Sequence, residues 1–332
     1  MRIKRGSVVL MAVLYALGTC TMWLIYTMSP RELIPEPSSG AGFEVVTVRL
    51  EVGEPEEEGV LLLEGYGQPH LTYRMWCTVE AAALRHPDLP VTLFMTSPVI
   101  RQSPLLLDLT TRFSNLRIFH LNLTQAFHGS RLEGWYTRRK WEDSQWPLSH
   151  LTDGIRWLLL WKYGGVYLDL DALVLRSLAH LPNCAARESE RYVAAGVLKF
   201  TRAHPLLRAC LNHFARHFNG HVWGANGPEL LTQVLIDRCG LELPSGRLPR
   251  CPDITILPPR AFYPVAWWDW RRYVQDDPDL ANELLNDPQV YTLHTWNFHT
   301  RYARVLLESQ QPYALAALAS CPVTAAHAGL RM

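Results

Sequence analysis

The stretch KYGGVYLDLDALVL, residues 162–175, places two acids inside an apolar run and constrains the fold more than any other segment. Side chains two residues apart on a β-strand point to the same face. If this stretch is a strand, Asp169 and Asp171 lie side by side and Leu170 points into the core. Adjacent carboxylates raise each other's pKa and resist burial. We therefore expect them at the end of a buried strand, with a positively charged group between them.

From residue 60 onward, strand patterns alternate with helix patterns, which predicts an α/β fold with a mostly parallel sheet. The predicted strands are residues 59–65, 90–97, 116–122, 166–171, 254–258 and 290–296. The predicted helices are residues 74–86, 105–115, 151–165, 204–218 and 227–240. In the third of these helices, Thr152 is a suitable N-cap and Gly164 a suitable C-terminal stop.

The N-terminal region predicts a membrane anchor. Residues 7–28 carry no charged side chain and follow a short segment with three basic ones. As a helix they would span about 33 Å, enough for a bilayer core of about 30 Å. We therefore expect a single-pass type II topology, with a cleaved signal peptide as the alternative. Its parts would be a cytosolic tail (1–6), a transmembrane signal anchor (7–28), a stem (29–59) and one lumenal catalytic domain (60–332).

Charge and cysteine content limit the partners and the compartment. The 32 Lys+Arg and 31 Asp+Glu leave a formal net charge of +1, so no basic excess points to a nucleic-acid partner. The triplet that begins at Asn122 is a glycosylation acceptor in a lumenal chain. Among the cysteines outside the anchor we predict a local bridge between Cys239 and Cys251, which flank a Pro/Gly-rich loop. The alternative is that several cysteines are buried free thiols.

Two acids at a strand end are typical of a site for a hard divalent cation. Mn²⁺ or Mg²⁺ binds few protein carboxylates and completes its coordination with water and substrate phosphates. We expect such an ion at Asp169 and Asp171, where it would bind the diphosphate of a nucleotide-linked substrate. Asp153 and Arg156 are neighbours on one helical face, and they either pair with each other or contact sugar hydroxyls. The alternative is a solvated strand end in which Asp171 caps the turn.

Several ordered blocks of the sequence are similar to one enzyme family. They are LTDGIRWLLLWKYGGVYLDLDALVLRSL, CTVEAAALRHPD, HVWGANGPELLTQV, ITILPPRAFYPVAWWDW and VYTLHTWN. These blocks resemble glycosyltransferase family 32, above all its lactosylceramide α-1,4-galactosyltransferases and its α-1,4-N-acetylglucosaminyl- and N-acetylgalactosaminyltransferases. The resemblance runs from about Leu61 to Cys321.

The resemblance implies a GT-A fold, a Rossmann-like sheet that binds a UDP-sugar together with Mn²⁺. Asp171 would ligate the metal directly, and Asp169 would contact the ribose or reach the metal through water. Asp153 and Arg156 would hold the donor sugar. Further substrate-binding positions would be Tyr167, Gly164 and Gly165.

Three more segments offer candidate site residues. His294 would be a third metal ligand, or else a hydrogen-bonded histidine of a buried strand. Asn226, Gly227 and Glu229 stand at a predicted helix start, where backbone N–H groups could meet sugar or phosphate, although Glu229 also suits the helix dipole alone. Trp268, in a tryptophan-rich segment, would stack on an acceptor sugar or a lipid, or would only pack against the core.

Two positions depart from the family pattern. Glu64 is followed by Gly65 and Tyr66, where the family has Thr and Ser, and Ala195 stands before Gly196, where the family has Asn. Both changes remove polar groups that the resemblance places near the donor.

We therefore predict a retaining α-1,4-glycosyltransferase of the Golgi membrane. It would transfer galactose or N-acetylgalactosamine from a UDP-sugar to a glycosphingolipid or glycan, alone or as a homo- or hetero-oligomer. One alternative is a catalytically impaired relative that binds glycans or acts as a scaffold. Another is a phosphatase of the haloacid-dehalogenase type, whose nucleophile strand also ends in D-x-D and for which DDPD, residues 276–279, would be a later acidic motif.

Overall fold

The computed structural model describes residues 46–332. The predicted cytosolic tail, the membrane anchor and residues 29–45 of the predicted stem lie outside the described residues. Within the described part of the chain, none of the helices combines the length and the apolar character needed to cross a bilayer.

A seven-stranded sheet forms the centre of the fold, in the order β10-β8-β9-β6-β2-β3-β5. Only β9 runs against its neighbours, because all other adjacent pairs are parallel. This confirms the predicted mostly parallel α/β sheet. Its strands are β2 (Val60–Glu64), β3 (Val91–Met95), β5 (Leu116–His120), β6 (Gly165–Leu168), β8 (Asn183–Arg187), β9 (Val193–Phe200) and β10 (Ile254–Leu257).

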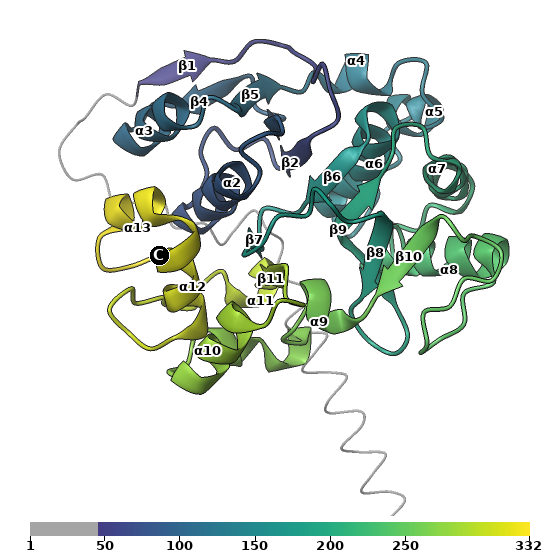
Figure 1. Cartoon of the computed structure of the whole chain (residues 1–332). Coiled ribbons are helices and arrows are strands. Elements are labelled where there is room, and N and C mark those ends of the chain that lie inside the picture. The colour runs from purple at the N-terminus through teal and green to yellow at the C-terminus, as the bar shows by residue number, and fades with distance from the viewer. Residues whose placement is uncertain (1–45) are drawn as a thin grey trace, which may run out of the picture. The chain divides into compact units, whose positions relative to one another are not determined.

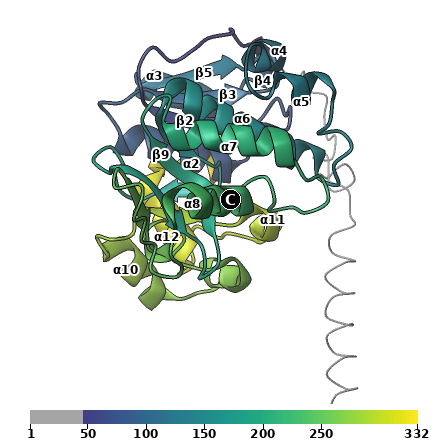
Figure 2. The same cartoon turned by 90° about the vertical axis from the view of Figure 1, so that its right-hand side faces the viewer.

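Helices cover both faces of this sheet, which explains why β2 and β3 are apolar at nearly every position and buried throughout. Figure 1 shows α2, α3 and α13 on one side of the strands and α6, α7 and α8 on the other; Figure 2 shows the second group from the front. These helices are α2 (Tyr73–Arg85), α3 (Pro104–Arg112), α6 (Pro147–Tyr163), α7 (Pro205–His217), α8 (Pro228–Cys239) and α13 (Pro322–Ala328).

Two small antiparallel pairs flank the main sheet, β1 (Thr47–Arg49) with β4 (Val99–Arg101) and β7 (Ala172–Val174) with β11 (Thr292–His294). The first pair means that part of the predicted stem packs with the folded unit. The remaining helical segments are α4 (Leu123–Phe127), α5 (Glu133–Thr137), α9 (Pro259–Phe262), the 3₁₀ helix η2 (Trp267–Tyr273), α10 (Pro278–Asn286), α11 (Asn297–Thr300) and α12 (Pro312–Ser320).

The helix before the acidic motif starts earlier than its sequence pattern predicts. It begins at Pro147, where the missing proline N–H costs nothing, and not after Thr152. The Thr152 hydroxyl instead donates to the Leu148 carbonyl one turn back. The predicted stop at Gly164 is confirmed, because this residue ends α6 with φ of 71°, a conformation that favours glycine.

Two disulfides link the described part of the chain. The predicted Cys239–Cys251 bridge is confirmed. A second bridge joins Cys77 in α2 to Cys321, between α12 and α13, and so ties the C-terminal helices to the sheet's first helix. Cys184 and Cys210 are buried free thiols, as the alternative interpretation held for part of the set.

Candidate active site

The two acids of the D-x-D motif lie in a turn and not on a strand. β6 ends at Leu168, and the N–H of Ala172, where β7 begins, donates to the Asp169 carbonyl at 3.0 Å. The chain bends here because the carboxylates resist burial inside the sheet, while Leu170 between them is buried as predicted. The acids still converge, but through the turn and not through strand alternation.

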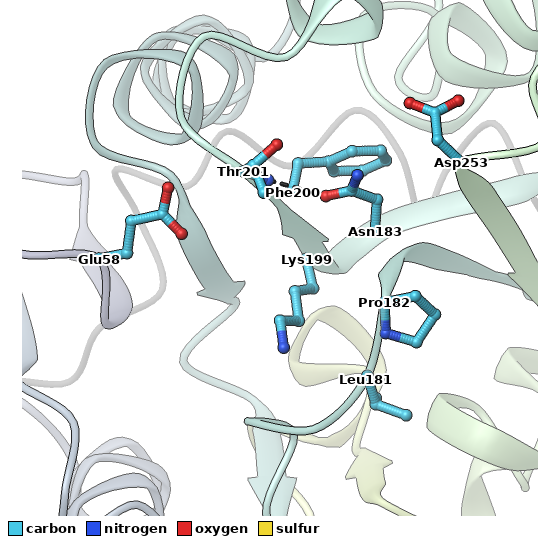
Figure 3. Close-up of a pocket in the computed structure, with 8 residues that line it drawn as sticks. All are labelled: Glu58, Leu181, Pro182, Asn183, Lys199, Phe200, Thr201 and Asp253. Atoms are coloured by element: carbon cyan, nitrogen blue, oxygen red, sulfur yellow. Dashed lines mark hydrogen bonds between the residues drawn. The ribbon is translucent and has the colours of Figure 1, made fainter.

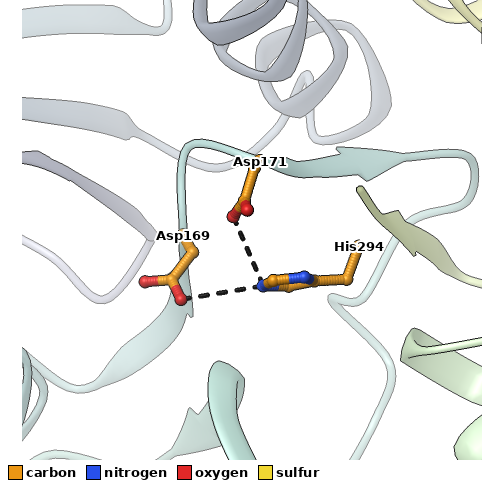
Figure 4. A group of neighbouring side chains, drawn as sticks. All are labelled: Asp169, Asp171 and His294. Atoms are coloured by element: carbon orange, nitrogen blue, oxygen red, sulfur yellow. Dashed lines mark ion pairs between the residues drawn. The ribbon is translucent and has the colours of Figure 1, made fainter. Parts of the chain in front are cut away.

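His294 is brought to the acids by strand pairing. β11 runs antiparallel to β7, with His294 opposite Ala172, and the Thr295 N–H donates to the Asp171 carbonyl at 2.8 Å. His294 Nε2 lies 3.3 Å from Asp171 Oδ1 and 3.8 Å from Asp169 Oδ2. Figure 4 shows the imidazole pointing between the two carboxylates. We call Asp169, Asp171 and His294 the triad.

Neighbouring donors fix the orientation of each carboxylate. Asp169 Oδ1 accepts hydrogen bonds from Arg156 Nη2 at 2.8 Å and from the Tyr167 hydroxyl at 2.9 Å. Asp171 Oδ2 accepts the backbone N–H of Asn297 at 2.7 Å. One oxygen of each acid therefore remains directed toward His294. Such outer contacts hold metal ligands in a defined geometry.

Arg156 bridges two acids. Its Nη1 donates to Asp153 Oδ1 at 2.9 Å while its Nη2 reaches Asp169. The predicted Asp153–Arg156 pair therefore exists, and it extends to the D-x-D motif. Its guanidinium also lies over the Tyr167 ring, 5.1 Å from the centroid. Asp153, Arg156 and Tyr167 are thus held in one buried network beside the triad.

Burial and charge together set the protonation of the network. Burial alone would raise the pKa of Asp169, but Arg156 and His294 outweigh it, so this pKa lies below its ordinary value. For Asp153, burial dominates and raises the pKa despite Arg156. Burial alone would lower the pKa of His294, but the charges of Asp171 and Asp169 raise it above its ordinary value. Asp169, which lies beside both the imidazole and the guanidinium, therefore stays ionised more readily than Asp153.

The triad fits a divalent cation. A Cβ built on Gly196 would lie 2.8 Å from His294 Nε2 and 2.9 Å from Asp169 Oδ2, so the glycine leaves open a space that a methyl group would fill. The three ligand atoms lie within 4.8 Å of one another. Ligands that share one ion at about 2.1 Å are about 3 Å apart. Two carboxylate oxygens and one imidazole nitrogen suit Mn²⁺ or Mg²⁺.

The start of α8 also approaches this site, at Gly227. A Cβ on Gly227 would lie 3.1 Å from Asp153 Oδ1, so the backbone comes close to the Asp153–Arg156 pair. Asn226 serves the local structure: its side chain binds the backbone of Asn219, and its carbonyl accepts the Trp157 indole N–H at 3.0 Å. Glu229 lies in the first turn of α8, as its helix-dipole interpretation requires.

Two predicted binding residues, Gly164 and Gly165, lie away from the triad. Gly164 and Gly165 stand at the amino end of β6, about 13 Å of strand from Asp169. The backbone that approaches them is the chain's own: a Cβ on Gly165 would lie 2.1 Å from the Gly59 carbonyl. Trp268 lies on η2, is 54% exposed, and packs edge-on against Trp267.

Sequence patterns did not point to several residues beside the triad. The Tyr263 ring lies 5.3 Å from the His294 ring, and its hydroxyl accepts the Val197 N–H at 3.0 Å. In the sequence Gly196 stands out only as the neighbour of Ala195, whereas in the structure it faces His294 and Asp169. Gly65, the other departure, packs so closely that a Cβ would meet the Thr152 hydroxyl at 2.4 Å. Only the tertiary contacts reveal these roles.

A separate hollow of about 420 Å³ lies at the opposite edge of the sheet, beside the start of β8 and the end of β9. Figure 3 shows Lys199 and Glu58 at its wall, together with Asn183 at the start of β8 and Thr201 just after the end of β9. Lys199 already donates to the backbone carbonyls of Leu178 and Ala179. We assign no chemistry to this hollow.

Comparison with known proteins defines the class and then the family. Residues 72–189 match a glycosyltransferase sugar-binding region containing a DXD motif, and residues 199–328 match an α-1,4-glycosyltransferase conserved region. The first match includes Asp169 and Asp171, so the site belongs to a glycosyltransferase.

Individual relatives narrow this class. The chain is 34% identical to the lactosylceramide 4-alpha-galactosyltransferase of Mus musculus over 281 residues, which cover 82% of this chain and 76% of the relative. It is 30% identical to the alpha-1,4-N-acetylglucosaminyltransferase of Homo sapiens over 267 residues, which cover 78% and 76%. The chain belongs to this family of α-1,4-glycosyltransferases.

Among solved structures, the chain is similar to the PaToxG glycosyltransferase, with a TM-score of 0.43 and 16% identity over 55% of this chain and 70% of that chain. It is also similar to the galactosyltransferase LgtC in complex with donor and acceptor sugar analogues, with a TM-score of 0.33 and 15% identity over 61% and 74%.

Proposed function

We propose that this protein is a metal-dependent α-1,4-hexosyltransferase of the GT-A type. It uses a UDP-sugar donor, galactose or N-acetylgalactosamine being the transferred sugar, and retains the anomeric configuration. The observation that carries the proposal is the triad of Asp169, Asp171 and His294 around the space left by Gly196. Family membership supports the linkage, since the relatives are named as 4-alpha-galactosyl- and alpha-1,4-N-acetylglucosaminyltransferases.

The triad would hold Mn²⁺, with Mg²⁺ as the alternative. When bound, this ion supplies positive charge to the donor diphosphate and so stabilises the leaving nucleotide. The protein's part is to keep the ligands in place: Arg156 and Tyr167 fix Asp169, and the Asn297 N–H fixes Asp171. Preorganised ligands need no rearrangement during the reaction.

The Asp153–Arg156 pair would position the donor sugar. A Cβ built on Gly227 would lie 3.1 Å from Asp153 Oδ1, so the backbone at the start of α8 passes close to this pair. Carboxylate and guanidinium groups form strong charge-assisted hydrogen bonds with sugar hydroxyls. The pair and the triad are joined through Asp169, so the sugar and the diphosphate would lie on neighbouring parts of one network.

The acceptor and the cellular setting follow from the relatives and the N-terminal sequence. We propose a glycosphingolipid or glycan acceptor, because the mouse relative is named for lactosylceramide. The uncharged segment 7–28 would anchor the chain in the Golgi membrane with the folded unit in the lumen. The exposed Trp268 remains a candidate for contact with the acceptor.

The phosphatase alternative finds no support at its second acidic motif. Asp276 Oδ1 accepts the Gln310 N–H at 3.1 Å, and Asp277 caps α10 by accepting the Leu280 N–H at 2.9 Å. Both side chains thus have local structural roles. A catalytically impaired relative that binds glycans is the second candidate function, favoured by the apolar Ala195 in β9.

The deciding experiment uses the full-length chain, purified in detergent, with Mn²⁺, lactosylceramide and three donors: UDP-galactose, UDP-N-acetylgalactosamine and UDP-N-acetylglucosamine. We expect transfer from one of the first two, and loss of at least 100-fold in rate for Asp171→Asn with the fold retained. Asp279→Asn, an exposed acid at the start of α10, is the matched control. Binding of UDP-sugar without any transfer would support the impaired relative instead. Full activity of Asp171→Asn would refute the assigned metal site.

A further inference from the structure

Glu188 is a carboxylate at the same edge of the sheet as the triad. It follows the last residue of β8, as Asp169 follows the last residue of β6. β8 and β6 both run opposite to β9, which lies between them, so their carboxyl ends lie at one edge. Two strand spacings separate them by about 10 Å. The topology therefore places Glu188 at the same edge of the sheet as the triad, two strands away from Asp169.

The backbone of Glu188 is held firmly. Its N–H donates to the Tyr192 carbonyl at 3.0 Å, closing the β8–β9 turn. Within that turn, the Ser189 hydroxyl oxygen accepts the N–H groups of Arg191 and Tyr192, both at 3.2 Å. The next residue, Val193, donates to the Thr232 hydroxyl of α8 at 2.9 Å. The carboxylate is thus presented from a rigid support that is anchored to α8.

The side chain of Glu188 makes no hydrogen bond or ion pair with the described residues, although it is partly buried. By contrast, two fully buried acids, Glu64 and Glu80, have hydrogen-bond donors within the chain. Glu64 accepts the N–H groups of Tyr66 and Gln68, and Glu80 accepts two N–H groups at the start of α13. The oxygens of Glu188 stay within reach of solvent, so its carboxylate is free to accept a hydrogen bond from a group outside the chain.

The charge of Glu188 acts on two residues at the triad. It interacts electrostatically with His294 and with Tyr263, whose ring packs on His294. Burial raises the pKa of Glu188 to about 7, and the His294 charge opposes this. β9, which lies between, offers only Ala195 and Gly196 near the triad, so it presents no polar side chain there.

We propose that Glu188 is a donor-binding residue whose carboxylate accepts a hydrogen bond from a hydroxyl of the transferred sugar. This inference rests on the proposed function. A carboxylate attracts neutral O–H donors and repels phosphate, so the diphosphate is excluded as its partner. The sugar is favoured over the nucleotide because Val193, at the end of the β8–β9 turn, is bonded to α8, and Gly227 at the start of that helix approaches the Asp153–Arg156 pair.

The test measures binding, separately from turnover. The full-length chain in detergent with Mn²⁺ is titrated calorimetrically with UDP and with each of the three UDP-sugars. For Glu188→Ala we expect the Kd of the UDP-sugar to rise on the order of 10- to 100-fold, as for the loss of one hydrogen bond to a charged group. The Kd of UDP should stay within about twofold. Glu188→Gln keeps an acceptor oxygen and should lie between the two.

Glu190→Gln is the matched control, since Glu190 is an exposed acid in the same turn. It should bind UDP and UDP-sugar as the wild type does. A wild-type UDP-sugar Kd for Glu188→Ala would overturn the inference. An equal loss for UDP and UDP-sugar would also overturn it, because Glu188 would then act on the nucleotide or on the fold.

Failure of the proposed function gives a different result. If the wild-type chain with Mn²⁺ binds neither UDP nor any of the UDP-sugars, the proposed function is refuted and this inference falls with it. If the wild type binds a UDP-sugar more tightly than UDP and Glu188→Ala removes that difference, the inference is supported, whether or not transfer occurs.

Discussion

Replacing Gly196 by Ala should weaken the metal site without unfolding the protein. The added Cβ would stand 2.8 Å from His294 Nε2 and 2.9 Å from Asp169 Oδ2. Gly196 has no left-handed backbone conformation, so alanine introduces no backbone strain. Its carbonyl accepts the Asp169 N–H at 2.8 Å, and this bond remains in the variant. The perturbation is therefore confined to the space between two ligands.

The size of the effect follows from the displacement that alanine forces. Nonbonded carbon contacts are comfortable from about 3.5 Å, so His294 and Asp169 must retreat by about 0.6 to 0.7 Å. Metal sites tolerate shifts of about 0.2 Å in ligand distance. Asp169 is also held by Arg156 and Tyr167 and cannot move freely. We expect Mn²⁺ affinity to fall about 10- to 100-fold, as when outer contacts of metal ligands are lost.

The assay is a Mn²⁺ titration of the purified full-length chain, followed by calorimetry and by the metal dependence of transfer. Gly134→Ala is the control, because a Cβ there would meet only the flexible guanidinium of Arg138 at 3.2 Å. It should bind Mn²⁺ normally. Unchanged Mn²⁺ affinity in a folded Gly196→Ala variant would refute the conclusion that the ion lies between these ligands.

Two further predictions concern stability. Burial raises the pKa of Glu64 to about 7, so its favourable contribution to the stability of the folded state is complete below about pH 4.5 and is lost as the pH rises toward 7. Relative to wild type, the free energy of unfolding of Glu64→Gln should therefore rise by up to about 3 kcal/mol between pH 5 and pH 8. An equal difference between the two proteins in denaturation curves at pH 5 and at pH 8 would contradict this. The disulfides close loops with sequence separations of 244 and 12 residues, which implies losses of about 5 and 3 kcal/mol. Thermal unfolding should therefore show Cys321→Ser to be less stable than Cys251→Ser, and the reverse order would refute the loop-length argument.

Local patterns in the sequence were sufficient for much of the fold. Alternating apolar segments predicted the strands β2, β3 and β5 and the helices between them, because each element must bury its apolar face against the same sheet. The loop bounded by Cys239 and Cys251 is short, so its disulfide was foreseeable. The predicted start of α6 was wrong because Pro147 and Thr152 both suit a helix N-terminus, and only packing decides between them.

The sequence by itself determined which side chains are candidates for the site: two acids beside an apolar strand, an Asp–Arg pair one helix earlier, and a histidine near the C-terminus. The tertiary structure decided which of these residues meet. Pairing of β11 with β7 brings His294 to the acids, although the two segments are far apart in the chain. Gly164, five positions before Asp169, lies at the other edge of the sheet. A strand separates its two ends while sheet pairing joins distant segments, so sequence distance is a poor guide to proximity at the site.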